Sequence, residues 1–180
     1  MIYYFTPYDS GGNVGKAYNE HIRLVPLEDD FIALTDRDAM FLTADYGKQI
    51  EDVIKMYPGT GIFTAYCNRV GNVHQRYNGV ISENHSWKYH IDLALQLQKE
   101  NYLGIKQINR SISGFLMIFQ KKTWQSVGGF SEKGMIAIDN DFSRKVLALG
   151  KNILLMEGVY MFHYYRLLEG GRKYKLHLQK

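Results

Sequence analysis

Cysteine is almost absent from this 180-residue chain: Cys67 stands alone, which excludes an intrachain disulfide. A chain without disulfides is typical of a reducing compartment. Cys67 lies in the apolar run GIFTAYC, where a small core residue is the better reading than a nucleophile. No apolar run approaches the roughly 20 residues of a membrane-spanning helix. The N-terminal stretch MIYYFTPY also lacks the basic start of a signal peptide. We therefore expect a cytoplasmic protein without a transmembrane segment.

Charge of one sign is not strongly dominant, since the net charge is +4 and charged residues make up 22% against 46% hydrophobic ones. This balance is that of a globular chain, and we expect one domain over residues 1–180. Much of the positive excess lies in the final stretch GGRKYKLHLQK, which predicts a mobile basic tail over 168–180. Such a tail suits a nucleotide phosphate, an anionic membrane, a nucleic acid or only solvent. No nucleic-acid-binding motif accompanies it, so we expect no nucleic-acid partner.

Apolar runs and helical periodicities alternate along most of the chain. Asn13 is the predicted cap of the first helix and Thr43 that of the second. The alternation predicts an α/β sandwich with a mostly parallel central sheet flanked by helices. Loops are expected between the elements, the longest over 71–86. The predicted strands cover 2–8, 30–36, 61–70, 114–120 and 152–167, the last as two short strands or one bent one; the predicted helices cover 14–25, 43–57, 87–101, 121–127 and 139–149.

Two carboxylates, Asp36 and Asp38, stand one residue apart at the end of the apolar run FIALT. In parallel sheets the ligand site lies beyond the carboxyl ends of the strands. Carboxylate oxygens at such a place suit Mg²⁺ or Mn²⁺, which keep positions open for substrate phosphates. The alternative is a pair of turn carboxylates that cap a following helix.

Further motifs follow Asp36 and Asp38 in a fixed order. Their order and spacing resemble the nucleotide-sugar glycosyltransferases of the GT-A fold, in particular the second glycosyltransferase sequence family. The resemblance covers about Ile2 to Arg166. It rests on Thr6-Pro7-Tyr8, Asn13-Val14-Gly15-Lys16-Ala17-Tyr18-Asn19, Asp36-Arg37-Asp38, Ser113-Gly114 before a strand, Gly128-Gly129-Phe130, Ile138-Asp139-Asn140-Asp141-Phe142 and Met161-Phe162-His163.

The resemblance implies a GT-A-type sandwich and a metal-dependent, inverting glycosyltransferase. It would move a hexosyl or N-acetylhexosaminyl group from a nucleotide sugar, with a UDP-sugar favoured, to an unknown acceptor hydroxyl. Asp139 would be the general base, and Mn²⁺ or Mg²⁺ would be held by Asp36, Asp38 and His163. The nucleotide-sugar would contact Thr6, Pro7, Tyr8, Asn13, Lys16, Ala17, Asp36, Arg37 and Gly114.

Two departures from the family pattern matter. Residues 24–30 connect the first helix directly to the Asp36 strand, where the family usually has an additional strand and helix. Ile138 stands where the family often has Glu. These departures favour an alternative function, a degenerate nucleotide-sugar-binding module without transfer activity.

Each site residue also has a structural interpretation. Asp139 suits a helix N-cap, Asp141 a partner of the helix dipole in the first turn, and His163 a satisfied core histidine. Trp124 suits stacking on an acceptor sugar or burial in the core. His74, His85 and His90 lack metal-ligand spacing, and we assign them no site role.

Overall fold

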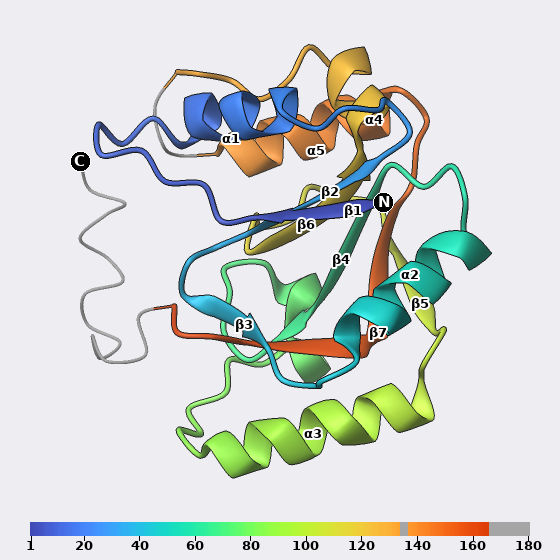
Figure 1. The fold of residues 1–180 in the computed structure, drawn as a ribbon. Helices are drawn as coiled ribbons and strands as arrows, with labels where there is room; N and C mark the ends of the chain where they lie inside the picture. Colours follow the sequence, from blue (N-terminus) through green and yellow to red (C-terminus); the bar gives the residue numbers. More distant parts are fainter. Residues whose placement is uncertain (134–136, 166–180) are drawn as a thin grey trace.

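The structure is a computed structural model that describes residues 1–133 and 137–165; the predicted basic tail, 168–180, lies outside the described residues. Seven strands form one sheet with helices on both sides of it (Figure 1). The strands are β1 (Ile2–Phe5), β2 (Phe31–Thr35), β3 (Ala39–Phe41), β4 (Ile62–Cys67), β5 (Ile105–Ile108), β6 (Leu116–Gln120) and β7 (Ile153–His163). The helices are α1 (Val14–Arg23), α2 (Tyr46–Met56), α3 (Trp87–Glu100), α4 (Lys121–Ser126) and α5 (Ile138–Ala148), with short 3₁₀ turns at Val73–Gln75 and Tyr77–Gly79.

The α/β class is confirmed, but the prediction of a mostly parallel sheet is wrong, because the sheet is mixed. Its order is β1-β2-β6-β4-β7-β3, and β5 also pairs with β7. β1 pairs with β2, and β4 with β7, in parallel; every other pairing is antiparallel. β3 and β5 are short strands that the sequence patterns did not predict, and each runs antiparallel to β7. β3 follows β2 with no helix between them, whereas β5 follows α3. The alternation of strands and helices in the sequence therefore did not predict the direction of each strand in the sheet.

The direct connection between the first helix and the second strand is confirmed. α1 is the crossover between the parallel strands β1 and β2, and residues 24–30 lead from it into β2. Asn13 caps α1 as predicted, since its side chain accepts a hydrogen bond from Lys16 N at 3.0 Å. Thr43 is not the cap of α2: Asp45 holds that position, and its carboxylate accepts from Gln98 Nε2 at 2.9 Å.

Two apolar layers lie on the two faces of the sheet. Ile22 of α1 and Phe142 of α5 belong to one layer, while Ile50 and Val53 of α2 belong to the other. Figure 1 shows α1, α4 and α5 together on one side of the strands, with α2 and α3 on the other. α3 packs on β7 through a small third cluster that contains Ala94. No helix within 1–133 and 137–165 is long and apolar enough to cross a membrane.

β7 is one continuous strand over Ile153–His163, so of the two predicted alternatives, two short strands or one bent strand, the structure shows a single strand. Its first residues pair with β5 and β4, and its last three pair with β3. The pairing of β4 with β7 has a register irregularity between Ala65 and Tyr66. The last residue of β7, His163, is brought opposite Ala39, directly after the acidic pair.

Candidate metal centre and adjoining pocket

Asp36 and Asp38 lie in a tight turn between β2 and β3. Ala39 N donates to Asp36 O at 3.1 Å, which closes the turn, and Asp36 N donates to Phe115 O at 3.1 Å. A strand follows this turn and not a helix, so the helix-cap interpretation of the pair is wrong. The two side chains remain 40% and 44% exposed, which leaves both carboxylates accessible to a ligand.

His163 completes a cluster of three ligating side chains. Its Nε2 lies 3.5 Å from Asp36 Oδ2 and 3.3 Å from Asp38 Oδ1. One ligand atom from each of the three residues lies within 4.8 Å of the others. The His163 side chain is 3% exposed, and its Nε2 lies next to both carboxylates. The predicted trio is therefore together in space, at the carboxyl ends of β2 and β7.

The other ring nitrogen of His163 shows how the cluster fits a cation. Nδ1 lies 2.9 Å from the main-chain oxygen of Arg69, and a carbonyl only accepts, so Nδ1 carries the hydrogen. Without a cation, Nε2 is the ion-pair partner of both carboxylates; a cation in that place would instead meet the Nε2 lone pair of the neutral ring and two carboxylate oxygens. Two carboxylates and one imidazole nitrogen are donors that can hold a divalent metal ion, and a histidine anchored through its second nitrogen is usual at metal sites.

The two carboxyls of the cluster differ in their acidity. Burial raises the pKa of Asp36, and the positive charge available on His163 opposes that effect. The hydrogen bond with His163 lowers the pKa of Asp38 below its ordinary value. Asp38 is accordingly the carboxyl that is more firmly ionised in the folded protein.

A pocket of about 250 Å³ adjoins the acidic pair. The Arg37 guanidinium carbon lies 5.7 Å from the centre of the Tyr8 ring, so a cation and an aromatic face meet at this pocket. Four residues predicted to contact a donor, Pro7, Tyr8, Asp36 and Arg37, are thus brought together. The pocket is lined by Pro7, Tyr8, Asp9, Val14, Tyr18, Thr35, Asp36, Arg37 and Asp38.

Four other predicted donor contacts have structural partners of their own. Thr6 Oγ1 shares a hydrogen bond of 2.9 Å with Thr35 Oγ1. Asn13 caps α1, and its Nδ2 donates to Glu132 O at 2.9 Å. Lys16 is exposed and lies 3.8 Å from Glu20, whereas Ala17 is buried in the core.

Asp139 is not the N-cap of α5, because Ala137 holds that position with a φ of 65°. Its carboxylate accepts from two main-chain N–H groups, Gly114 N through Oδ2 and Asn140 N through Oδ1, both at 2.8 Å. Burial raises the pKa of Asp139. The predicted residues Gly114 and Asp139 are therefore in direct contact.

Tyr18 was not predicted as a site residue, yet it lines the pocket beside the acidic pair. It is 5% exposed, and its ring packs edge-on against Phe130 with centroids 5.1 Å apart. Burial raises the pKa of its hydroxyl, and the charges of Asp36 and Asp139 raise it further. Tyr18 therefore belongs both to the buried core and to the wall of the pocket.

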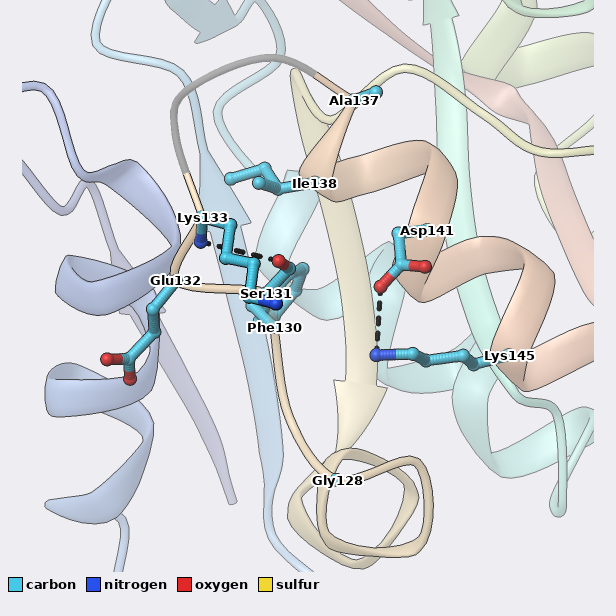
Figure 2. A pocket seen from close by; sticks show the side chains of 9 residues that line it. All are labelled: Gly128, Phe130, Ser131, Glu132, Lys133, Ala137, Ile138, Asp141 and Lys145. Carbon is cyan, nitrogen blue, oxygen red and sulfur yellow. Dashed lines mark hydrogen bonds and ion pairs between the residues drawn. The ribbon is translucent and has the colours of Figure 1, made fainter.

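Figure 2 shows a second pocket, of about 510 Å³, between the 128–133 loop and the first turns of α5. Asp141 and Lys145 form an ion pair of 2.8 Å along its helical wall, so Asp141 has a side-chain partner as well as a place in the first turn. Residues 134–136, between Lys133 and Ala137, lie outside the described part of the chain, and we assign this pocket no role.

Trp124 and His90 have partners within the fold. Trp124 Nε1 donates to Asn19 Oδ1 at 2.9 Å, and its ring packs against the core beneath α1. His90 is fully buried, with Tyr160 Oη and Asn84 O each 2.8 Å from a ring nitrogen.

No protein-family model matches this chain, and no curated protein is significantly similar to it in sequence.

Proposed function

We propose that this protein is a metal-dependent, inverting glycosyltransferase of the GT-A type that uses a nucleotide sugar as donor, a UDP-sugar in first place. One observation carries the proposal: a cluster of Asp36, Asp38 and His163 borders a pocket that also contains Tyr8 and Arg37. A donor consists of a diphosphate attached to a nucleoside and a sugar. A cation site beside a pocket of mixed aromatic and cationic lining suits such a ligand.

The residues of the cluster would hold Mn²⁺ or Mg²⁺ through two carboxylate oxygens and His163 Nε2. When bound, the cation acts as a Lewis acid that neutralises the negative charge of the departing nucleoside diphosphate. Arg37 is exposed and next to both carboxylates in sequence, so its guanidinium is available to donate to phosphate oxygens. Tyr8 offers a ring face, 68% exposed, for stacking on a planar group.

Asp139 is the proposed general base for the acceptor hydroxyl. Burial raises the pKa of the Asp139 carboxyl. The carboxylate is therefore a stronger base, better able to take the proton of the acceptor hydroxyl. Two main-chain N–H groups fix its orientation. A positioned base contributes about 10²–10⁴-fold to rate, and direct attack by the activated hydroxyl inverts the anomeric carbon.

The test is hydrolysis of a panel of nucleotide sugars without acceptor, in Mn²⁺, in Mg²⁺ and with a chelator. Metal-dependent release of one nucleoside diphosphate would identify both donor and reaction class. If no donor is hydrolysed, titration with UDP and Mn²⁺ follows, and absence of binding there would refute the proposal.

A binding module without transfer activity is the second candidate. It is favoured by the contacts of three predicted donor-binding residues: Asn13 caps α1, Lys16 pairs with Glu20, and Ala17 is buried. Fewer groups are therefore available to bind a donor than the sequence motifs imply. The two candidates differ in one result: a binding module shows a Mn²⁺-dependent rise in melting temperature with UDP, yet no turnover with any donor and acceptor pair.

A further inference from the structure

Arg69 is a buried arginine directly beyond the carboxyl end of β4. Its side chain is only 8% exposed. Nε donates to the main-chain oxygen of Tyr165 at 3.2 Å, and Nη1 donates to the main-chain oxygen of Ser82 at 3.2 Å. Nη1 also lies 2.9 Å from a carboxylate oxygen of Glu83. One guanidinium therefore joins the end of β4 to the 82–83 loop and to the segment after β7.

The main chain of the same residue contacts the candidate metal ligand. Arg69 O accepts from His163 Nδ1 at 2.9 Å. The neighbouring Asn68 accepts from His163 N through Oδ1 at 2.7 Å, and the Phe115 ring stacks on the imidazole with centroids 5.6 Å apart. Arg69 thus contacts the ring edge of His163, Asn68 its main chain and Phe115 one ring face. The contact with Arg69 decides which ring nitrogen carries hydrogen.

We propose that Arg69 is the positioning residue of the metal centre: its carbonyl fixes the His163 ring with Nε2 toward Asp36 and Asp38, and its guanidinium holds that carbonyl in place. This inference rests on the proposed function, because it requires the three side chains to bind a cation. It goes beyond that function by making cation affinity depend on a residue that does not touch the cation.

The Arg69 side chain is needed because the Arg69 carbonyl lies beyond the last paired residues of β4 and β7. The last β4–β7 pair is Cys67 with Met161, so Arg69 O is not fixed by a ladder bond. The guanidinium contacts replace that support on both sides. Partners of this kind orient metal-bound histidines, and their loss typically weakens metal affinity by about 10–100-fold.

The main test replaces Arg69 by Met, which keeps an unbranched stem that reaches about as far as Nε and removes the five N–H donors. Manganese affinity is measured by electron paramagnetic resonance of free Mn²⁺, without nucleotide, and folding is measured by the thermal melting of the metal-free protein. We expect the dissociation constant for Mn²⁺ to rise about 10–100-fold, even at temperatures where the variant is fully folded.

Arg76 provides a matched control. It also donates to main-chain oxygens near the end of β4, from Nε to Val70 at 2.8 Å and from Nη2 to Gly71 at 2.9 Å, but neither carbonyl contacts His163. Arg76→Met should lower the melting temperature while its Mn²⁺ affinity stays at the wild-type value. Equal losses of affinity in Arg76→Met and Arg69→Met would overturn the inference, because the effect would then be general loosening.

A measurement on the wild-type protein keeps the inference testable if Arg69→Met does not fold. ¹⁵N NMR of the His163 ring, with diamagnetic Zn²⁺ bound, should show a protonated Nδ1 and a metal-bound Nε2. The opposite assignment would overturn the inference.

The failures of the two proposals are distinguishable. A wild-type protein that binds neither Mn²⁺ nor Zn²⁺ refutes the metal centre and this inference with it. A wild-type protein that binds Mn²⁺, together with a folded Arg69→Met variant of equal affinity, refutes this inference alone.

Discussion

The main-chain N–H of Gly114 donates to Oδ2 of Asp139 at 2.8 Å, and this bond joins the amino end of β6 to the first turn of α5. A side chain at position 114 would crowd the contact. A Cβ there would lie 3.1 Å from Asp139 Cβ and 3.5 Å from Asp139 Oδ2. Glycine therefore allows the close approach that orients the carboxylate.

Gly114→Ala should consequently displace the Asp139 carboxylate with little loss of stability. We expect a fall of about 1 kcal/mol in the free energy of unfolding, and a drop of on the order of 10²-fold in any metal-dependent transfer. Urea denaturation and turnover on the identified donor measure the two effects. Asp139→Asn should match the loss of turnover, while UDP affinity stays near wild type. Substantial turnover in Asp139→Asn would mean that the base lies elsewhere.

Asp38→Asn should abolish metal-dependent ligand binding. Ligand at about 100 times its dissociation constant stabilises a protein by about 2.7 kcal/mol, so Mn²⁺ with UDP should raise the melting temperature of the wild type by several degrees. The variant should lack this rise because it loses one charged ligand. Asp141→Asn, which alters an acid paired with Lys145 on α5, is the control and should retain the full rise.

His163→Gln should change which cation is preferred. Imidazole favours transition metals, whereas Mg²⁺ prefers oxygen ligands throughout. Loss of the ring nitrogen should therefore weaken Mn²⁺ binding by about tenfold or more and weaken Mg²⁺ binding less. Isothermal titration with each cation measures the ratio of affinities. An unchanged ratio would show that His163 is only a core residue beside the carboxylates.

Two helical glycines should respond oppositely to alanine. A Cβ on Gly15 would lie 2.0 Å from the main-chain oxygen of Ser131, so Gly15→Ala must push α1 away from the 128–133 loop. We expect a loss of about 1–3 kcal/mol. Gly47 in α2 has open space around the same position, and Gly47→Ala should stabilise by about 0.5 kcal/mol. Chemical denaturation of both variants tests the contrast.

Cys67 should be unreactive in the folded protein. The residue is fully buried, and burial raises the pKa of its thiol well above the ordinary value. At pH 8 the thiol is therefore neutral, and only the thiolate is a nucleophile. A thiol reagent should label Cys67 in denaturant but not in native buffer. Fast native labelling would contradict the described burial.

The sequence predicted those parts of the fold that depend on local patterns. Asn13 before a helical periodicity identified the start of α1, and the continuous apolar residues of β2 identified a strand. The strand direction was not predictable in this way. β3 and β5 are only three and four residues long, too short for a periodic signal, and without them the pattern read as repeated parallel crossovers.

The candidate site divides in the same way. The sequence by itself determined that Asp36 and Asp38 stand at the end of a buried strand, because their spacing and the apolar run before them are local properties. No local pattern places His163 beside them, and the expectation that it joins them came only from the family resemblance. The tertiary structure decided the contact, because the pairing of Ala39 with His163 joins segments over a hundred residues apart.

Arg69 illustrates the limit of sequence reasoning. As a single arginine after a strand it carries no motif, and its contacts to Ser82, Tyr165 and His163 come from three separate segments. The sequence determined which side chains could ligate a cation. Long-range strand pairing and one buried guanidinium decided how they face one another, since such contacts depend on the whole folded chain and leave no local pattern.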